Sequence, residues 1–341
     1  MRNAVVPSIK DTHPVGTTTG PTRRSLLAGA AALALTGPRI ASADQKVVFG
    51  VDFYILGAPV RIAQDKGYFR EFGVDAEIQP FSLGIDSVDA VLTGRVNFGI
   101  AIDFATNTRL QSGQLKVVTA LLEPEPGFHK LAVAAGIGKP QDLAGKRIGI
   151  ANGTAQHLVT MEYLRHAGIN PSQVTLLPLL SPLELVASLR ANRIDAAFLW
   201  GDATNQATTI PGVTILSDDK PALVRSYGYM LTSNQFAAQN PKAVENSLRA
   251  LAKAVQWMEA NPAEAATLMA GHAKAPLEVI KAQMPLQHYT VSLTQPQLDA
   301  FNRIAEFSAA NKVTRVKVEP RKFIDTSFLK KVDAKRVTLG D

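Results

Sequence analysis

The sequence of 341 residues predicts an α/β protein in which two lobes face each other across a ligand cleft. Three observations support this prediction. The chain repeats itself at an offset of 98 residues, each repeat alternates strands with helices, and polar or glycine-containing turns follow the strands. Apolar residues make up 46% of the chain and charged residues 19%, as in ordinary globular proteins.

Residues 1–43 resemble an export signal and not a part of the fold. Arg23 and Arg24 precede an apolar, alanine-rich run at 26–35, and an Ala-Ser-Ala cleavage pattern ends at Ala43. The paired arginines favour twin-arginine export, and an ordinary secretory signal is the alternative. We therefore expect cleavage near Ala43 and a location in the periplasm. Part of the net charge of +7 belongs to this segment, and no nucleic-acid partner is expected.

The repeat is clearest where residues 87–102 are aligned with residues 185–200. In both stretches an amphipathic helix ends at Gly94 or Asn192, residue types that favour a left-handed backbone, and a short apolar strand follows. Each unit therefore reads as strand, helix, strand, helix, strand.

Alternating strands and helices predict parallel sheets, in which ligands bind at the carboxyl ends of the strands. The expected strands at the start and middle of the units are 46–51, 76–81, 147–151 and 174–180. The loops expected to line the cleft are 52–56, 82–86, 103–106, 152–157, 181–184 and 200–204.

The rest of the chain is expected to connect the lobes and cover the first one. The predicted features are a turn at 123–127, a strand at 130–135, a return strand at 227–232 that closes the second lobe, and helices after Pro241, at 263–270 and at 296–310. The resulting division is 44–133 for the first part of lobe 1, 134–230 for lobe 2, and 231–341 for the return to lobe 1 with the C-terminal helices.

The turn before the helix that starts near residue 155 is the first candidate site. Its residues Gly153, Thr154 and Ala155 carry no charge, but the first N–H groups of a helix are unpaired and its N-terminus is positive. The turn can therefore hold an anion without Lys or Arg. The alternative is a plain cap made by the Thr154 hydroxyl. His157 either contacts the ligand or only packs.

Other candidates follow the remaining strands. Ser82, Leu83 and Gly84 offer a hydroxyl and N–H groups. Aromatic walls are expected from Phe53, Tyr54, Phe104 and Trp200. Asp103 and Asp202 occupy equivalent places in the two repeats and either cap helices or accept hydrogen bonds from a ligand amine. Tyr227, at the start of the return strand, completes the set.

Several chemistries are not expected from this composition. The chain has no Cys, which excludes disulfides, Cys-ligated metals and a Cys nucleophile. The six His are scattered, and no P-loop, GxSxG or complete dinucleotide motif occurs. We expect no cofactor, no metal and no catalytic residue.

Several motifs together resemble the substrate-binding proteins of ABC importers, of the aliphatic-sulfonate, taurine and nitrate type. These motifs are Ala63-Gln64-Asp65-Lys66-Gly67-Tyr68-Phe69, Leu92-Thr93-Gly94-Arg95-Val96-Asn97-Phe98-Gly99, Asp142-Leu143-Ala144-Gly145-Lys146-Arg147-Ile148-Gly149, and Asn192-Arg193-Ile194-Asp195-Ala196. The resemblance implies a periplasmic-binding-protein-like fold of type II, with the anionic head of the ligand at Ser82 and Gly153-Thr154.

The resemblance also implies a function. The chain is expected to capture a sulfonate or taurine-like ligand as a monomer and to deliver it to an ABC permease with its ATPase. The alternatives are a binder of a thiamine-precursor pyrimidine or other nitrogen compound, and a ligand-sensing subunit. An enzyme is less expected, because the related desulfinase needs a Cys and the related pyrimidine-forming synthase is cytosolic.

Overall fold

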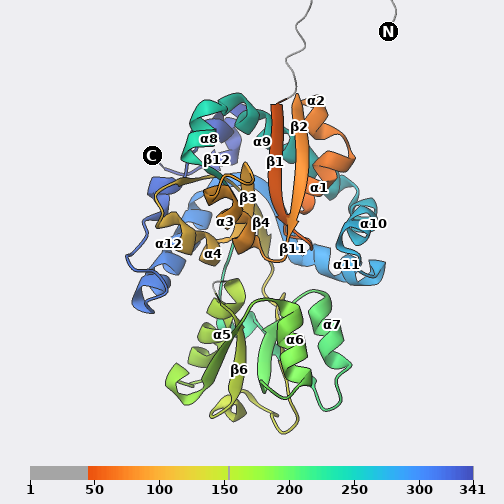
Figure 1. The fold of residues 1–341 in the computed structure, drawn as a ribbon, viewed down its shortest axis with the longest axis vertical. Coiled ribbons are helices and arrows are strands. Elements are labelled where there is room, and N and C mark those ends of the chain that lie inside the picture. The colour runs from red at the N-terminus through yellow and green to blue at the C-terminus, as the bar shows by residue number, and fades with distance from the viewer. Residues whose placement is uncertain (1–44, 153, 341) are drawn as a thin grey trace, which may run out of the picture. The chain divides into compact units, whose positions relative to one another are not determined.

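The structure is a computed structural model that describes residues 45–152 and 154–340. Its strands form a seven-stranded sheet in the order β12-β11-β4-β10-β3-β1-β2 and a five-stranded sheet in the order β7-β6-β8-β5-β9 (Figure 1). The larger sheet contains β1 (Gln45–Asp52), β2 (Val74–Phe81), β3 (Phe98–Ile102), β4 (Leu115–Pro124), β10 (Gly228–Ser233), β11 (Gln287–Thr294) and β12 (Val337–Thr338). The smaller sheet contains β5 (Lys130–Val133), β6 (Arg147–Ala151), β7 (Thr175–Leu179), β8 (Ala196–Leu199) and β9 (Thr214–Asp218).

The helices lie between these strands and at the C-terminal end. They are α1 (Ala58–Asp65), α2 (Tyr68–Glu71), α3 (Gly84–Leu92), α4 (Asp103–Leu110), α5 (Ala155–His166), α6 (Pro182–Arg190), α7 (Asp202–Thr208), α8 (Asn234–Gln239), α9 (Pro241–Ala260), α10 (Pro262–Ala273), α11 (Leu277–Gln283), α12 (Gln295–Ala310) and α13 (Ser327–Val332). The expected export signal at 1–43 lies outside the described residues. Among the described helices, none is both long and apolar enough to cross a membrane.

The predicted repeat is present in the structure. The strand order β3-β1-β2 in one sheet matches the order β8-β6-β7 in the other, and the pairs are parallel. Gly94 and Asn192, which are equivalent in the alignment, both have a left-handed backbone, with φ of 72° and 51°. The two repeats therefore end their second helix in the same way.

A matching pair of polar contacts fixes the third strand of each repeat to the first. Asn97 Oδ1 accepts from the backbone N of Val48 at 2.8 Å, and Asp195 Oδ2 accepts from the backbone N of Arg147 at 2.8 Å. Asn97 and Asp195 are separated by the repeat offset. The polar residue before each third strand thus has a structural role in both units.

The sheets are mixed, whereas the alternation of strands and helices predicted parallel ones. β10 runs antiparallel to both β3 and β4, and β5 runs antiparallel to both β8 and β9. β4 was not predicted, and it extends to Pro124, into the expected turn at 123–127. These strands connect the two sheets, so they lie outside the strand-helix repeat that carried the prediction.

The return strand also differs from its prediction. The strand expected at 227–232 to close the second lobe is β10, and it lies in the larger sheet between β4 and β3. Its central residues Tyr229, Met230 and Leu231 are all buried, as expected for a strand covered on both faces. β5 belongs to the smaller sheet. The chain therefore crosses between the sheets at residues 125–129 and 219–227.

Both faces of the smaller sheet are packed. In β8, Phe198 joins an apolar cluster with Val159 of α5, while Leu199 joins a cluster with Leu185 of α6 and Ala203 of α7. The alternation follows the two-residue period of a strand. The C-terminal helices pack on elements of the larger sheet's half, with α9 against α1 and α2 and α12 against α4, as predicted.

Candidate functional site

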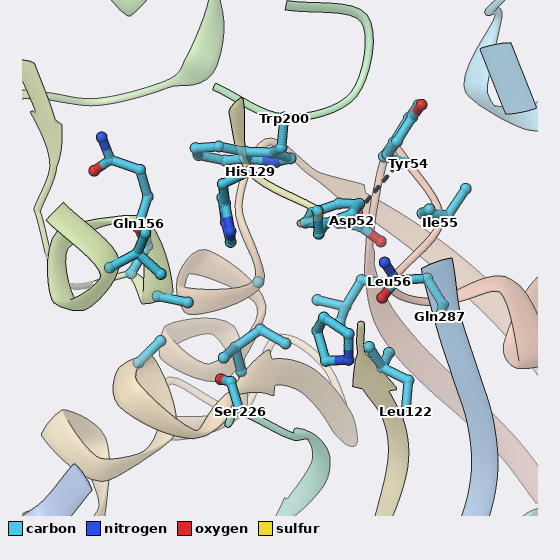
Figure 2. Close-up of a pocket in the computed structure, with 18 of the residues that line it drawn as sticks. Asp52, Tyr54, Ile55, Leu56, Leu122, His129, Gln156, Trp200, Ser226 and Gln287 are labelled. Carbon is cyan, nitrogen blue, oxygen red and sulfur yellow. Dashed lines mark hydrogen bonds between the residues drawn. The ribbon is translucent and has the colours of Figure 1, made fainter. Parts of the chain in front are cut away.

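A pocket with an interior of about 130 Å³ lies where the strands of both repeats end (Figure 2). Five of the six predicted loops contribute lining residues, and 181–184 contributes none. Both crossing segments, 125–129 and 219–227, also line it. One water needs roughly 10–15 Å³ by this measure, so the pocket admits a ligand of about ten non-hydrogen atoms.

The charged groups that line the pocket are unusual for a site that binds anions. Three carboxylates line it, those of Asp52, Glu125 and Asp219, together with His129. Among the residues that the structure describes, no Lys and no Arg lines the pocket. Glu125 is paired with the exposed His288. A ligand with a cationic or N–H group therefore suits this pocket better than a bare anion does.

Asp52 closes β1 and starts the loop that follows. Its Oδ1 accepts from the backbone N of Gly57 at 3.0 Å, and its Oδ2 accepts from the backbone N of Tyr54 at 3.1 Å. Burial raises the pKa of Asp52 above its ordinary value, although these hydrogen bonds and the charge of Arg61 lower it. The side chain is held in place by its own loop and remains part of the pocket wall.

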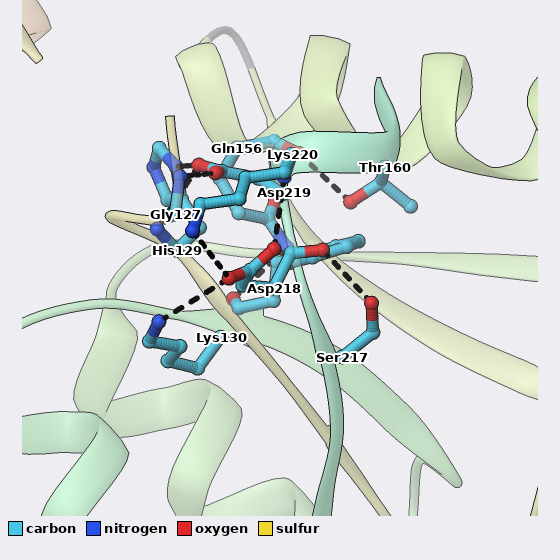
Figure 3. Close-up of polar contacts among 10 residues, drawn as sticks. Gly127, His129, Lys130, Gln156, Thr160, Ser217, Asp218, Asp219 and Lys220 are labelled. Atoms are coloured by element: carbon cyan, nitrogen blue, oxygen red, sulfur yellow. Dashed lines mark hydrogen bonds and ion pairs between the residues drawn. The ribbon is translucent and has the colours of Figure 1, made fainter. Parts of the chain in front are cut away.

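His129 and Asp219 form a buried pair at the point where the chain crosses between the sheets (Figure 3). Nδ1 of His129 lies 2.7 Å from Oδ2 of Asp219, and both residues are less than 10% exposed. Asp219 also accepts from the backbone N of Gly127 and of His129. Burial raises the pKa of Asp219, but the hydrogen bonds and charge of His129 outweigh it, and the pKa lies below its ordinary value.

Two helices begin at the pocket without a side-chain cap. α3 starts at Gly84 and α5 starts at Ala155, and both residues line the pocket. Within the described residues, no partner accepts from the backbone N–H of Gly84 or Ile85. First-turn amides of this kind are available to an anion.

The hydroxyl of Thr154 does not cap α5, which corrects the alternative derived from the sequence. Its Oγ1 donates to the backbone O of Ala151 at 2.8 Å, and Thr154 lines the pocket. Gly153 lies outside the described residues. Gln156 lines the pocket as well, but its amide is used internally, since it accepts from the backbone N of Ala151 and donates to the backbone O of Gly149.

The aromatic candidates divide into two groups. Tyr54 and Trp200 line the pocket, and Figure 2 shows both rings at its edge. Burial and the charges of Asp202 and Asp52 raise the pKa of the Tyr54 hydroxyl, which is buried without a partner in the described part of the chain. Phe53 is 52% exposed and lies outside the pocket, and Phe104 is fully buried.

The two aspartates chosen from the sequence do not line the pocket. Asp103 is fully buried, where it accepts from Ser226 Oγ at 2.6 Å and from the backbone N of Tyr227 at 2.9 Å. Asp202 accepts from Nε2 of Gln206 at 2.8 Å within α7. Their hydrogen bonds serve the helix starts and the crossing segment.

Two further sequence candidates also lie outside the pocket lining. Tyr227 is 4% exposed and donates its backbone N–H to Asp103. His157 packs its ring edge-on against Phe104 with centroids 5.6 Å apart, and burial lowers its pKa. Its contact with Phe104 is a packing contact. Ser82, Leu83 and Gly84 do line the pocket.

Gln287 is a lining residue that the sequence analysis missed. It is 7% exposed, and its Nε2 has no hydrogen-bond partner in the described residues (Figure 2). It starts β11, whose alternating apolar residues Tyr289, Val291 and Leu293 are a recognisable strand signal. A buried amide without a partner is costly unless a ligand or water satisfies it.

No group of three or more potential metal ligands occurs among the residues that the structure describes. The pocket offers backbone amides, carboxylates, an imidazole and aromatic rings. This set can bind a small organic molecule through hydrogen bonds and charge.

The chain is similar in sequence to proteins of a known family. The profile of the NMT1/THI5-like family matches residues 57–265. The taurine-binding periplasmic protein of Escherichia coli is 29% identical over 230 residues, which is 65% of this chain and 70% of that protein. The 4-amino-5-hydroxymethyl-2-methylpyrimidine phosphate synthase of Saccharomyces cerevisiae is 25% identical over 223 residues, 61% of this chain and 64% of that protein.

The fold is shared with solved structures. The alkanesulfonate-binding protein of Xanthomonas axonopodis, bound to MOPS, superposes with a TM-score of 0.72 and 19% sequence identity, covering 83% of this chain and 98% of that protein. The predicted α/β fold of the periplasmic-binding-protein type is confirmed.

Proposed function

The chain belongs to the NMT1/THI5-like family, and on this premise we propose that it is the extracytoplasmic solute-binding component of an ABC importer. It captures a small organic zwitterion of the taurine type and delivers it to a membrane permease with its ATPase. The resemblance inferred from the sequence motifs is confirmed by the family match and by the relatives.

The observation that carries this proposal is the composition of the pocket wall. The wall combines two helix starts without side-chain caps, at Gly84 and Ala155, with the carboxylate of Asp52. The described residues add no Lys or Arg to it. Amides at a helix start favour an anion, and a carboxylate favours an ammonium group. A molecule with both charges uses both features.

In the proposed binding mode, the anionic head lies at the first turns of α3 and α5, and the amine lies toward Asp52. The aromatic rings of Tyr54 and Trp200 cover the apolar part of the ligand. The taurine-binding relative supports this ligand class. A bare anion such as nitrate would make no use of the Asp52 carboxylate.

The proposed mechanism involves binding without covalent chemistry. A ligand that contacts residues from both sheets favours the conformation in which both sets of contacts exist. The segments 125–129 and 219–227, which connect the sheets, are the proposed hinges. The conformation with ligand bound then docks on the permease. We propose the periplasm as the location, with export directed by residues 1–43.

An aminopyrimidine is the second candidate ligand. The aromatic rings and the carboxylates of the pocket suit a flat ring with exocyclic N–H groups. The pyrimidine phosphate synthase among the relatives points to the same chemical class.

Thermal unfolding of the chain from Asp44 onward, measured against a ligand panel, tests the proposal. The panel contains taurine, alkanesulfonates, sulfate, nitrate, bicarbonate and aminopyrimidines. A ligand at about a hundred times its Kd adds about 2.7 kcal/mol to the free energy of unfolding, which gives a clear rise in Tm. A rise with taurine supports the proposal, and a rise only with aminopyrimidines supports the second candidate. A Tm that no compound changes contradicts both.

A further inference from the structure

We propose that His129 is the side chain that recognises the anionic group of the ligand, and that Asp219 positions the imidazole and determines which of its nitrogens faces the pocket. This inference rests on the proposed function, because it assigns a contact within the same pocket. Asp219 acts here as a positioning residue and not as a ligand contact.

The geometry of the pair fixes the tautomer of His129. An ionised carboxylate only accepts hydrogen bonds, so the 2.7 Å contact between Oδ2 of Asp219 and Nδ1 of His129 requires a proton on Nδ1. Figure 2 shows the ring of His129 pointing into the pocket. Nε2 is thereby left for the ligand.

Asp219 is already occupied by donors from the protein. Besides Nδ1 of His129, its carboxylate accepts from the backbone N of Gly127 and, at 3.0 Å, from the backbone N of His129. The backbone N of Asp219 in turn donates to the backbone O of His129 at 3.1 Å. These bonds join the two crossing segments and hold the imidazole at the hinge between the sheets.

The charge distribution makes His129 the anion-binding side chain. Among the lining residues in the described part of the chain, it is the one side chain that can become cationic. The ring packs edge-on to Trp200 and Phe128, with centroids 5.7 Å and 5.2 Å away. The charged or titratable groups around it are Asp219 and Lys220 at the second crossing, Asp218 of β9, Lys130 of β5, Glu125 with its partner His288, and Asp52 at the end of β1.

Because the tautomer is fixed, the protonation state of Nε2 decides whether His129 attracts or repels an anion. When His129 is neutral, Nε2 carries a lone pair and repels an anion. When His129 is protonated, Nε2 donates a charge-assisted hydrogen bond to the anion. The form of the pocket that binds an anion is therefore the one in which Nε2 of His129 carries a proton.

Histidine ¹⁵N NMR of the chain from Asp44 onward tests the tautomer without any ligand. At about pH 8.5, His129 should carry its proton on Nδ1. In the Asp219→Asn variant the proton should no longer be confined to Nδ1 of His129, because an Asn side chain can donate to Nδ1 as well as accept from it. A proton on Nε2 of the wild-type His129 would overturn the proposal.

Calorimetric titration with taurine and with ethanesulfonate tests the ligand contact. His129→Gln should weaken the binding of both probes by about tenfold or more, because the anion loses a charge-assisted hydrogen bond. His272→Gln is the matched control. His272 also contacts a carboxylate, since its Nε2 lies 2.7 Å from Oδ2 of Asp65, but His272 does not line the pocket.

The outcomes separate this inference from the proposed function. Binding that is equally strong in the wild-type protein and in His129→Gln would overturn the role of His129 while leaving the proposed function intact. If neither probe binds, the proposed ligand class fails and so does the anion contact assigned to His129, whatever the tautomer. Loss of binding in His272→Gln as well would show a general effect of removing a histidine, which also contradicts a specific contact.

Discussion

The ring of Tyr54 packs against Gly201 so closely that a Cβ on this glycine would lie 3.0 Å from Cε1 of Tyr54. Tyr54 follows β1 of the larger sheet, and Gly201 follows β8 of the smaller sheet. Gly201 also has a φ of 60°, a backbone conformation that favours glycine. The contact thus joins the two sheets at the edge of the pocket.

We predict that Gly201→Ala weakens ligand binding as well as stability. The backbone strain should lower the free energy of unfolding by about 1–3 kcal/mol, and the added Cβ should push Tyr54 away from α7. Gly67→Ala is the control, because Gly67 has a φ of 73° but open space around the added Cβ. Chemical unfolding and calorimetry check both variants. Unchanged ligand affinity in Gly201→Ala would contradict a role for this contact in binding.

We predict that Ala155→Pro weakens binding of a sulfonate, while Ala155→Gly does not. Proline is well tolerated at the first position of a helix and removes the N–H group there, whereas glycine keeps it. Thr154 has an extended backbone, which a following proline allows. A lost hydrogen bond to a charged group corresponds to about 1.5–3 kcal/mol, or roughly tenfold or more in Kd. Equal affinities of the two variants would place the anion elsewhere.

We predict that Gln287→Leu stabilises the free protein but weakens ligand binding. The substitution removes a buried amide whose Nε2 has no partner in the described residues, so the free energy of unfolding should rise. The ligand would lose a hydrogen bond, and its Kd should rise about fivefold or more. Urea unfolding and calorimetry together check this. Lower stability with unchanged affinity would mean that Gln287 serves the fold.

We predict that Asp103 makes the protein less stable as the pH rises from about 4 to about 7. Burial raises the pKa of Asp103 from 3.8 to about 7, although hydrogen bonds from Ser226, Tyr227 and Phe104 lower it. The folded state therefore holds a proton that the unfolded state has lost in this range, which favours folding at the lower pH. Urea unfolding at several pH values gives the free energy of unfolding at each pH. This free energy should fall less steeply with rising pH in Asp103→Asn than in the wild-type protein. The same pH dependence of the free energy of unfolding in both proteins would contradict the raised pKa of Asp103.

The sequence was sufficient to predict the repeated part of the fold. The strand-helix alternation and the equivalence of Gly94 with Asn192 identify both repeats, because side-chain periodicity and helix ends are local properties. The antiparallel strands β4, β10 and β11 pair with partners far away in the chain. Nothing local indicates which sheet such a strand joins, which explains why β10 was assigned to the wrong lobe.

The candidate site was predictable as a set of loops but not as a set of side chains. Alternate positions in one loop point in different directions, so Tyr54 lines the pocket while the neighbouring Phe53 is exposed. Asp103 was chosen because it follows a strand, yet its carboxylate is used by Ser226 and Tyr227. His129 and Gln287 reach the pocket from a crossing segment and a distant strand, where no repeat pattern marks them.

Calorimetric titration of the chain from Asp44 onward with taurine and ethanesulfonate is the most direct test of the proposed zwitterion site. The two ligands differ only in the amine, which we place at Asp52. The wild-type protein should bind taurine about tenfold or more tightly than ethanesulfonate. Asp52→Asn should lose this preference, and Asp202→Asn, outside the pocket, should keep it. Equal affinities for the two ligands in the wild-type protein, or a preference that survives Asp52→Asn, would contradict the proposed site.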